Sequence, residues 1–135
     1  MPFALDASIV LAWAFPDGQH PVADAALERL DTDDGAVPAL WWFEVRSALI
    51  TDERRQRLAQ AATAEFLQRL SRLLIAVDYT PDESVLLDMA RRYRLSVYDA
   101  AYLELAVRLG IPLTTTDSDL ITAAPQAGVP LLTAG

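Results

Sequence analysis

Four carboxylates lie beside apolar residues at widely separated points of the chain: Asp6, Glu44, Asp99 and Asp117. Acidic side chains are seldom buried without a partner, so these positions need an explanation. If folding brings them together, two like charges ~4 Å apart repel by ~4 kcal/mol at an effective dielectric of ~20. Either a carboxylate pKa then rises or a bound cation neutralises the charge.

A hard divalent cation is what such a group of oxygens would bind. The chain has no cysteine and no lysine, and we expect its one histidine, His20, to be inert in a loop beside Pro21. A site made of carboxylates alone suits Mg²⁺ or Mn²⁺. Such an ion activates water and stabilises charge on a phosphodiester, and two ions ~3.5–4 Å apart clamp the attacking and leaving oxygens. The acids are therefore suited to metal-assisted phosphodiester hydrolysis.

Each carboxylate also has a structural interpretation. Asp99 stands in the first turn of a predicted helix, where a negative charge stabilises the helix dipole. Asp6 precedes Ala-Ser and suits a helix N-cap. The sequence Thr-Asp-Ser-Asp, which contains Asp117 and Asp119, is common turn chemistry. It is the combination of the acids that favours a metal site.

Short apolar runs alternate with longer amphipathic segments along the chain. We predict strands at 3–5, 36–37, 75–77, 111–115 and 129–132, and helices at 7–14, 22–30, 40–52, 59–74, 83–93, 96–109 and 119–124. Strands that alternate with helices predict a mainly parallel sheet with helices on both faces. We see no linker and no internal repeat, so we expect residues 1–135 to form a single α/β domain.

The stretch from Ser96 to Asp119 links these elements to the acids. Ser96 suits an N-cap, Gly110 suits the C-terminal stop, and the helix between them is apolar on most sides. Asp117 falls just past the strand that follows. The carboxyl ends of parallel strands share one edge of the sheet, and ligands bind outside that edge. We therefore expect Asp6 and Asp117 to be neighbours there.

Composition sets limits on the kind of protein. The chain has 135 residues, 53% of them hydrophobic, and a net charge of −8. The acidic balance counts moderately against a nucleic-acid partner, because such proteins usually present a basic surface. The N-terminal MPFALDAS lacks the features of a signal peptide, and no apolar run approaches the ~18 residues of a membrane span. We expect a soluble, cytoplasmic protein that does not contact membranes.

Four stretches of the chain resemble, in order, the motifs of PIN-domain ribonucleases, and most closely the VapC-type toxins of bacterial toxin–antitoxin pairs. They are LDASIVLAWAFPD with Asp6, PALWWFEVRSAL with Glu44, LSVYDAAYLELA with Asp99, and LTTTDSDL with Asp117. No single motif is specific, but four in sequence at family spacing are a strong signal. The resemblance covers nearly the whole chain and implies a three-layer α/β/α sandwich with about five short strands.

The resemblance implies a metal-dependent endoribonuclease, often a homodimer, that a cognate antitoxin inhibits by inserting a C-terminal segment into the active-site groove. It assigns the metal, Mg²⁺ or Mn²⁺, to Asp6, Asp99 and Asp117, and makes Glu44 a further catalytic acid. Ser8 and Thr115 become supporting hydroxyls. Asp119 is either an auxiliary ligand or a helix cap.

Other residues have less specific patterns. Ser47 stands where the family often has asparagine, and Arg46 is a candidate contact for RNA or an antitoxin carboxylate. The clusters 54–57 and 91–94 each hold three arginines, which either offset helix dipoles or contact RNA phosphates. Trp41 and Trp42 cannot both face inward from one helix, so we expect one in the core and one exposed.

Two alternatives compete with the toxin. One is a non-catalytic binding module on the same scaffold, and the other is a free-standing RNA-processing nuclease. A phosphate-receiver domain also uses acids at strand ends but needs a lysine, which the chain lacks. A haloacid-dehalogenase-like phosphatase would need an aspartate where Ser8 stands.

Overall fold

The computed structural model describes residues 1–15, 18 and 20–134, so Pro16 and Asp17 of the first motif lie outside the described residues. Predicted element ends are within four residues of the observed ones, the last strand apart. The elements are β1 (Phe3–Leu5), α1 (Ala7–Ala12), α2 (Pro21–Arg29), β2 (Gly35–Pro38), α3 (Leu40–Arg54), α4 (Gln60–Leu70), β3 (Ile75–Asp78), α5 (Glu83–Arg92), α6 (Val97–Leu109), β4 (Leu113–Thr114) and α7 (Ser118–Gln126).

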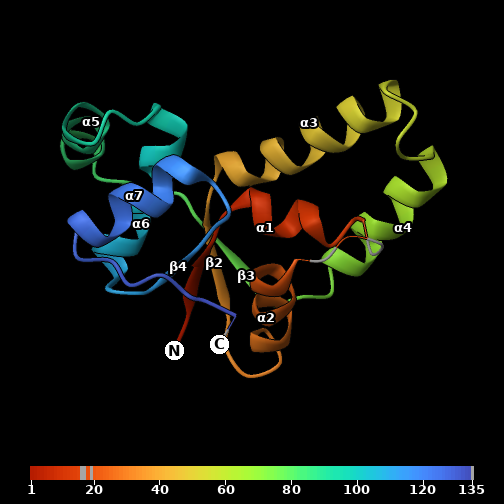
Figure 1. Cartoon of the computed structure of the whole chain (residues 1–135), viewed down its shortest axis with the longest axis horizontal. Coiled ribbons are helices and arrows are strands. Elements are labelled where there is room, and N and C mark those ends of the chain that lie inside the picture. The colour runs from red at the N-terminus through yellow and green to blue at the C-terminus, as the bar shows by residue number, and fades with distance from the viewer. Residues whose placement is uncertain (16–17, 19, 135) are drawn as a thin grey trace.

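The four strands form one parallel sheet in the order β3-β2-β1-β4. Helices α5, α6 and α7 lie on one side of it and α1, α2 and α4 on the other (Figure 1). This arrangement confirms the α/β/α sandwich. The fifth predicted strand, 129–132, is reduced to an isolated parallel bridge between Leu113 and Leu131. Pro130 has no N–H to donate, which limits the ladder at this edge.

Helix α6 lies against the middle of the sheet and contacts both β1 and β2. Its residues from Ala100 to Ala106 are all buried, as its apolar sequence predicts. The Ser96 hydroxyl accepts a hydrogen bond from the Asp99 N–H at 3.0 Å, so Ser96 is the N-cap. Gly110 ends the helix in the left-handed conformation (φ +64°), which glycine adopts without strain.

A charged cluster ties the C-terminal half of α6 to β3. Glu104 is only 1% exposed, and Arg108 donates to both of its carboxylate oxygens, at 2.8 and 3.2 Å. The same guanidinium donates to both oxygens of Asp78, at 2.9 and 3.1 Å. The Asp82 N–H also reaches Glu104, at 3.3 Å. These bonds hold α6 against the segment between β3 and α5, which fixes the direction in which α6 presents its N-terminal end.

Helix α3 has a buried face and an exposed aromatic face. Trp41, Val45 and Leu49 are buried against the core, whereas Trp42 is 47% exposed. The prediction of one buried and one exposed tryptophan is thus confirmed. The exposed Trp42 ring packs edge-on against Phe43, with centroids 5.1 Å apart.

Among the described residues, no helix combines the length and the apolar character that a membrane crossing requires.

Candidate active site

The four carboxylates gather at the carboxyl edge of the sheet. Strands β1 and β4 pair directly, which places Asp6, just after β1, near Asp117, just before α7. Asp99 enters from the first turn of α6, and Glu44 from α3, four residues after the helix begins at Leu40. All four line one cleft, so the structure brings together the acids that the sequence picked out.

Asp6 is the most deeply buried of the four, at 6% exposure. The hydroxyls of Ser8 and Thr115 both donate to its Oδ2 at 2.7 Å. Each hydroxyl also accepts from the chain after β4, Ser8 from the Thr116 N–H at 3.1 Å and Thr115 from the Asp117 N–H at 2.9 Å. The two hydroxyls thus lock Asp6 to the Asp117 segment. Burial raises the Asp6 pKa, although the two hydroxyl bonds lower it in part.

Glu44 is fixed by a hydrogen bond from α6. The Tyr102 hydroxyl, on α6, donates to Glu44 Oε1 at 2.5 Å. Tyr102 is fully buried, so its ring holds this hydroxyl in place. Burial raises the pKa of Glu44, and the negative charges of Asp6 and Asp99 raise it further. The carboxylate is therefore oriented, and its ionisation is less favourable than that of a solvent-exposed glutamate.

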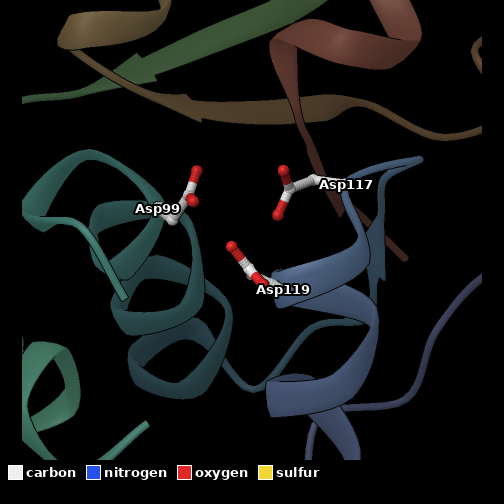
Figure 2. Close-up of side chains that lie close together, drawn as sticks. All are labelled: Asp99, Asp117 and Asp119. Atoms are coloured by element: carbon white, nitrogen blue, oxygen red, sulfur yellow. The ribbon is translucent and has the colours of Figure 1, made fainter. Parts of the chain in front are cut away.

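Asp99, Asp117 and Asp119 converge on one point (Figure 2). Each offers an oxygen within 4.8 Å of an oxygen of the other two. Burial raises the pKa of Asp99 to about 6, and the charges of Asp117, Asp6 and Asp119 contribute. The Ser96 hydroxyl takes the capping role at the start of α6, so the Asp99 side chain is not needed for it.

The structure shows which of Asp117 and Asp119 caps helix α7. Asp117 is the N-cap of α7, and its Oδ2 accepts from the Leu120 N–H at 3.0 Å. Its other oxygen, Oδ1, is not used by this cap. Asp119 lies in the first turn of α7 with its side chain exposed and turned toward Asp99 and Asp117 (Figure 2). It is therefore not the helix cap, and it is placed as an auxiliary ligand would be.

The cleft is open and measures about 840 Å³. Its lining includes the four acids and the exposed aromatic residues Phe43 and Tyr98, which are the chain neighbours of Glu44 and Asp99. From there the cleft follows α3 to its C-terminal end at Arg55. Ser47, the residue that departs from the family pattern, also lines it. A hydroxyl therefore faces the cleft where the family often has an amide.

The donor set fits a hard divalent cation. The converging ligand atoms are all carboxylate oxygens, and each of Asp6, Glu44 and Asp99 has a pKa raised by burial and by the charge of its neighbours. A cation at this point would relieve that repulsion. Mg²⁺ and Mn²⁺ prefer oxygen ligands of this kind.

The family model for the PIN domain matches residues 3–125 of the chain. The chain belongs to the PIN-domain family. It is 29% identical over 136 aligned positions to Ribonuclease VapC3 of Pyrobaculum aerophilum, an alignment that covers 96% of this chain and all of that protein. The resemblance to PIN domains of the VapC type is thus confirmed.

Two crystal structures share the fold of this PIN domain. PAE2754 from Pyrobaculum aerophilum superposes with a TM-score of 0.72 at 24% identity, over 91% of this chain and 84% of that one. FitAcB from Neisseria gonorrhoeae superposes with a TM-score of 0.67 at 16% identity, over 98% and 97% of the respective chains. These similarities support the architecture alone.

Arg46 lies outside the cleft of this PIN domain. Its guanidinium stacks on the Trp42 ring, 3.8 Å from the centroid, and donates to the Trp42 carbonyl oxygen at 3.1 Å. Arg46 follows Glu44 by two residues, which turns it to a different face of α3. Arg55, eleven residues after Glu44, lines the cleft instead.

Neither Arg55 nor Tyr102, the hydrogen-bond partner of Glu44, was among the predicted site residues. Tyr102 is buried within α6, whose sequence is apolar on most sides, but its hydroxyl serves the site. A buried tyrosine needs a hydrogen-bond partner, and that requirement was the available signal. The partner could not be identified because Glu44 lies 58 positions away.

Proposed function

We propose that this PIN domain is a metal-dependent endoribonuclease that hydrolyses RNA phosphodiester bonds. The observation that carries the proposal is the convergence of Asp6, Glu44, Asp99 and Asp117, from four separate segments, on one open cleft. The raised pKa values within this group support a bound cation. The similarity to a protein named Ribonuclease VapC3 supports RNA as the substrate.

In this proposal Asp6, Asp99 and Asp117 hold Mg²⁺ or Mn²⁺, with Asp119 as an auxiliary ligand. The ion would supply an activated water and stabilise negative charge on the phosphate. Ser8 and Thr115 keep the Asp6 carboxylate fixed through their bonds to Oδ2. Glu44, oriented by Tyr102, accepts a hydrogen bond from the attacking water and so directs it.

Cleavage of RNA by the purified protein tests the proposal. We expect cutting in Mg²⁺ or Mn²⁺, none in EDTA, and a loss of at least a hundredfold in Asp6→Asn and in Asp99→Asn, because each removes a metal ligand. Asp88→Asn is the matched control, since Asp88 is exposed on α5 and does not line the cleft. Equal cutting by all three variants would reject the assignment. Mn²⁺ calorimetry separates the non-catalytic alternative, which predicts no binding at millimolar metal.

We further propose that the protein is the toxin of a toxin–antitoxin pair and forms a homodimer. The exposed Trp42–Phe43 pair supports a protein interface on α3, because aromatic side chains are enriched at interfaces. A short gene upstream whose product binds this protein and blocks RNA cleavage would support the toxin, whereas its absence would favour a free-standing RNA-processing nuclease. Light scattering of the purified protein tests the dimer.

A further inference from the structure

One face of helix α3 forms a continuous wall of the cleft. The residues on it recur at the spacing of a single helical face: Glu44, Ser47, Ala48, Thr51, Asp52 and Arg55. The wall starts at the acids and ends at the C-cap of the helix. At ~1.5 Å per residue, its eleven steps span ~16 Å along the helix axis. The cleft therefore extends well beyond the metal site.

Arg55 carries a charge opposite to that of the acidic residues that line the cleft. Of the described residues that line the cleft, Arg55 alone is basic, whereas Asp6, Glu44, Asp52, Asp99 and Asp117 are acidic. Its side chain is exposed and forms no ion pair with any residue that the structure describes. Asp52, one helical turn earlier, does not engage it. A guanidinium that forms no ion pair with a described residue is thus placed in the cleft, eleven residues along α3 from Glu44.

The end of α3 separates Arg55 from the arginines beside it. Gln56 adopts the left-handed conformation (φ +58°), and its N–H donates to the Glu53 carbonyl at 3.0 Å. The Arg57 N–H donates to the Asp52 carbonyl at 2.9 Å. This pattern is a Schellman motif, which ends the helix sharply after Arg55. Arg57 therefore leaves the helix, and Arg54 lies ~100° around it; neither lines the cleft.

We propose that Arg55 binds a backbone phosphate of the RNA substrate, a few nucleotides from the bond that is cut. The inference rests on the proposed nuclease function. A strand seated over the acids and running along α3 brings a phosphate to Arg55. Phosphates are spaced by at least the ~3.4 Å of a stacked strand, so ~16 Å corresponds to at most about five nucleotides. A planar guanidinium suits bidentate phosphate binding.

A purely structural role predicts something different. A cation at a helix C-terminus stabilises the helix dipole. That role applies to Arg54 as well as to Arg55, and it affects stability rather than RNA binding. Arg54→Ala is therefore the matched control: the same residue type, adjacent and exposed, but outside the cleft. Thermal melts of every variant separate loss of fold from loss of contact.

The test uses the full chain and an RNA that the parent protein cuts. We expect Arg55→Ala to raise KM about five- to tenfold while kcat stays within twofold, because the contact is remote from the reacting phosphate. The slope of log(kcat/KM) against log[salt] should become shallower by about 0.7, the value for one phosphate on a single strand. Arg55→Lys should restore most of this slope. Arg54→Ala should match the parent in both measurements.

Substrate truncation gives an independent measurement. Removing the nucleotides that reach Arg55 should raise KM of the parent by the same factor, with no further rise in Arg55→Ala. If Arg55→Ala behaves like Arg54→Ala, or if kcat falls and KM does not, the inference is overturned. An Arg55→Ala protein that cuts normally but escapes a protein inhibitor would also overturn it and assign the arginine to that partner. If the parent cuts no RNA, the proposed function itself fails.

Discussion

Replacing Asp99 by asparagine should stabilise the metal-free protein. The pKa of Asp99 is raised to about 6 from an ordinary value of 3.8, because burial and the charges of Asp117, Asp6 and Asp119 oppose its ionisation. A pKa difference of about two corresponds to ~3 kcal/mol. Asp99 is partly exposed, and solvent screening reduces this to ~1–2 kcal/mol. Asparagine has nearly the same shape and no charge, so Asp99→Asn removes this cost.

The pH dependence fixes the sign of the effect. Between about pH 4 and pH 6 folded Asp99 retains a proton that the unfolded chain has lost, so the free energy of unfolding of the parent falls as pH rises through this window. Asp99→Asn lacks this fall. Below pH 4 the two proteins should therefore be about equally stable, and above pH 6 the variant should melt higher. For a chain of this length, ~1–2 kcal/mol corresponds to about 4–7 °C in Tm.

Thermal melts followed by circular dichroism from pH 4 to pH 8 in EDTA provide the assay. Asp82→Asn is a control of opposite sign, because the Asp82 side chain caps α5 and its hydrogen bonds lower its pKa. It should lose stability at neutral pH. Mg²⁺ should raise the Tm of the parent and not that of Asp99→Asn. An Asp99→Asn protein that melts below the parent at pH 7.5 in EDTA would refute the claim that the acids repel one another.

Three further substitutions test the supports of the site. Thr115→Val removes a hydrogen bond that lowers the Asp6 pKa, so the acid limb of the pH–activity profile should move to higher pH; an unchanged limb argues against this support. Tyr102→Phe frees Glu44 and should lower kcat/KM about tenfold with a loss of ~1 kcal/mol in unfolding free energy; retained activity would remove Tyr102 from the site. Arg108→Ala leaves the buried Glu104 carboxylate without a counter-charge and should cost ~3 kcal/mol, or about 10 °C in Tm. In contrast, Arg69→Ala, at an exposed arginine, should change Tm by under ~2 °C.

The sequence predicted the architecture because its signals are local. Ser96 and Gly110 mark the two ends of α6, and apolar periodicity marks what lies between them. The last strand was over-predicted, since Val129 to Leu132 is apolar but Pro130 cannot complete a ladder. The placement of the acids followed from a general rule, that parallel strands end on the same edge.

Contacts between distant segments were not predictable in the same way. Whether Arg46 or Arg55 faces the cleft depends on the rotation of α3 about its own axis, which the packing of Trp41, Val45 and Leu49 decides. The spacing from Glu44 to Arg55 is that of one helical face and was visible in the sequence. It could be assigned to a wall of the cleft only once the structure had located the cleft. Similarly, Ser96 as the cap leaves the Asp99 side chain free for the site, and the capping signal alone could not assign the two roles.

A titration of Mn²⁺ that follows metal binding and RNA cleavage in the same solution tests the central claim most directly. Free Mn²⁺ can be counted by electron paramagnetic resonance while the cut RNA is measured in parallel. The carboxylate site predicts that both curves share one midpoint and that both are lost in Asp117→Asn. Cleavage that persists with all metal chelated, or Mn²⁺ binding that is unchanged when Asp6, Asp99 and Asp117 are all asparagine, would contradict it.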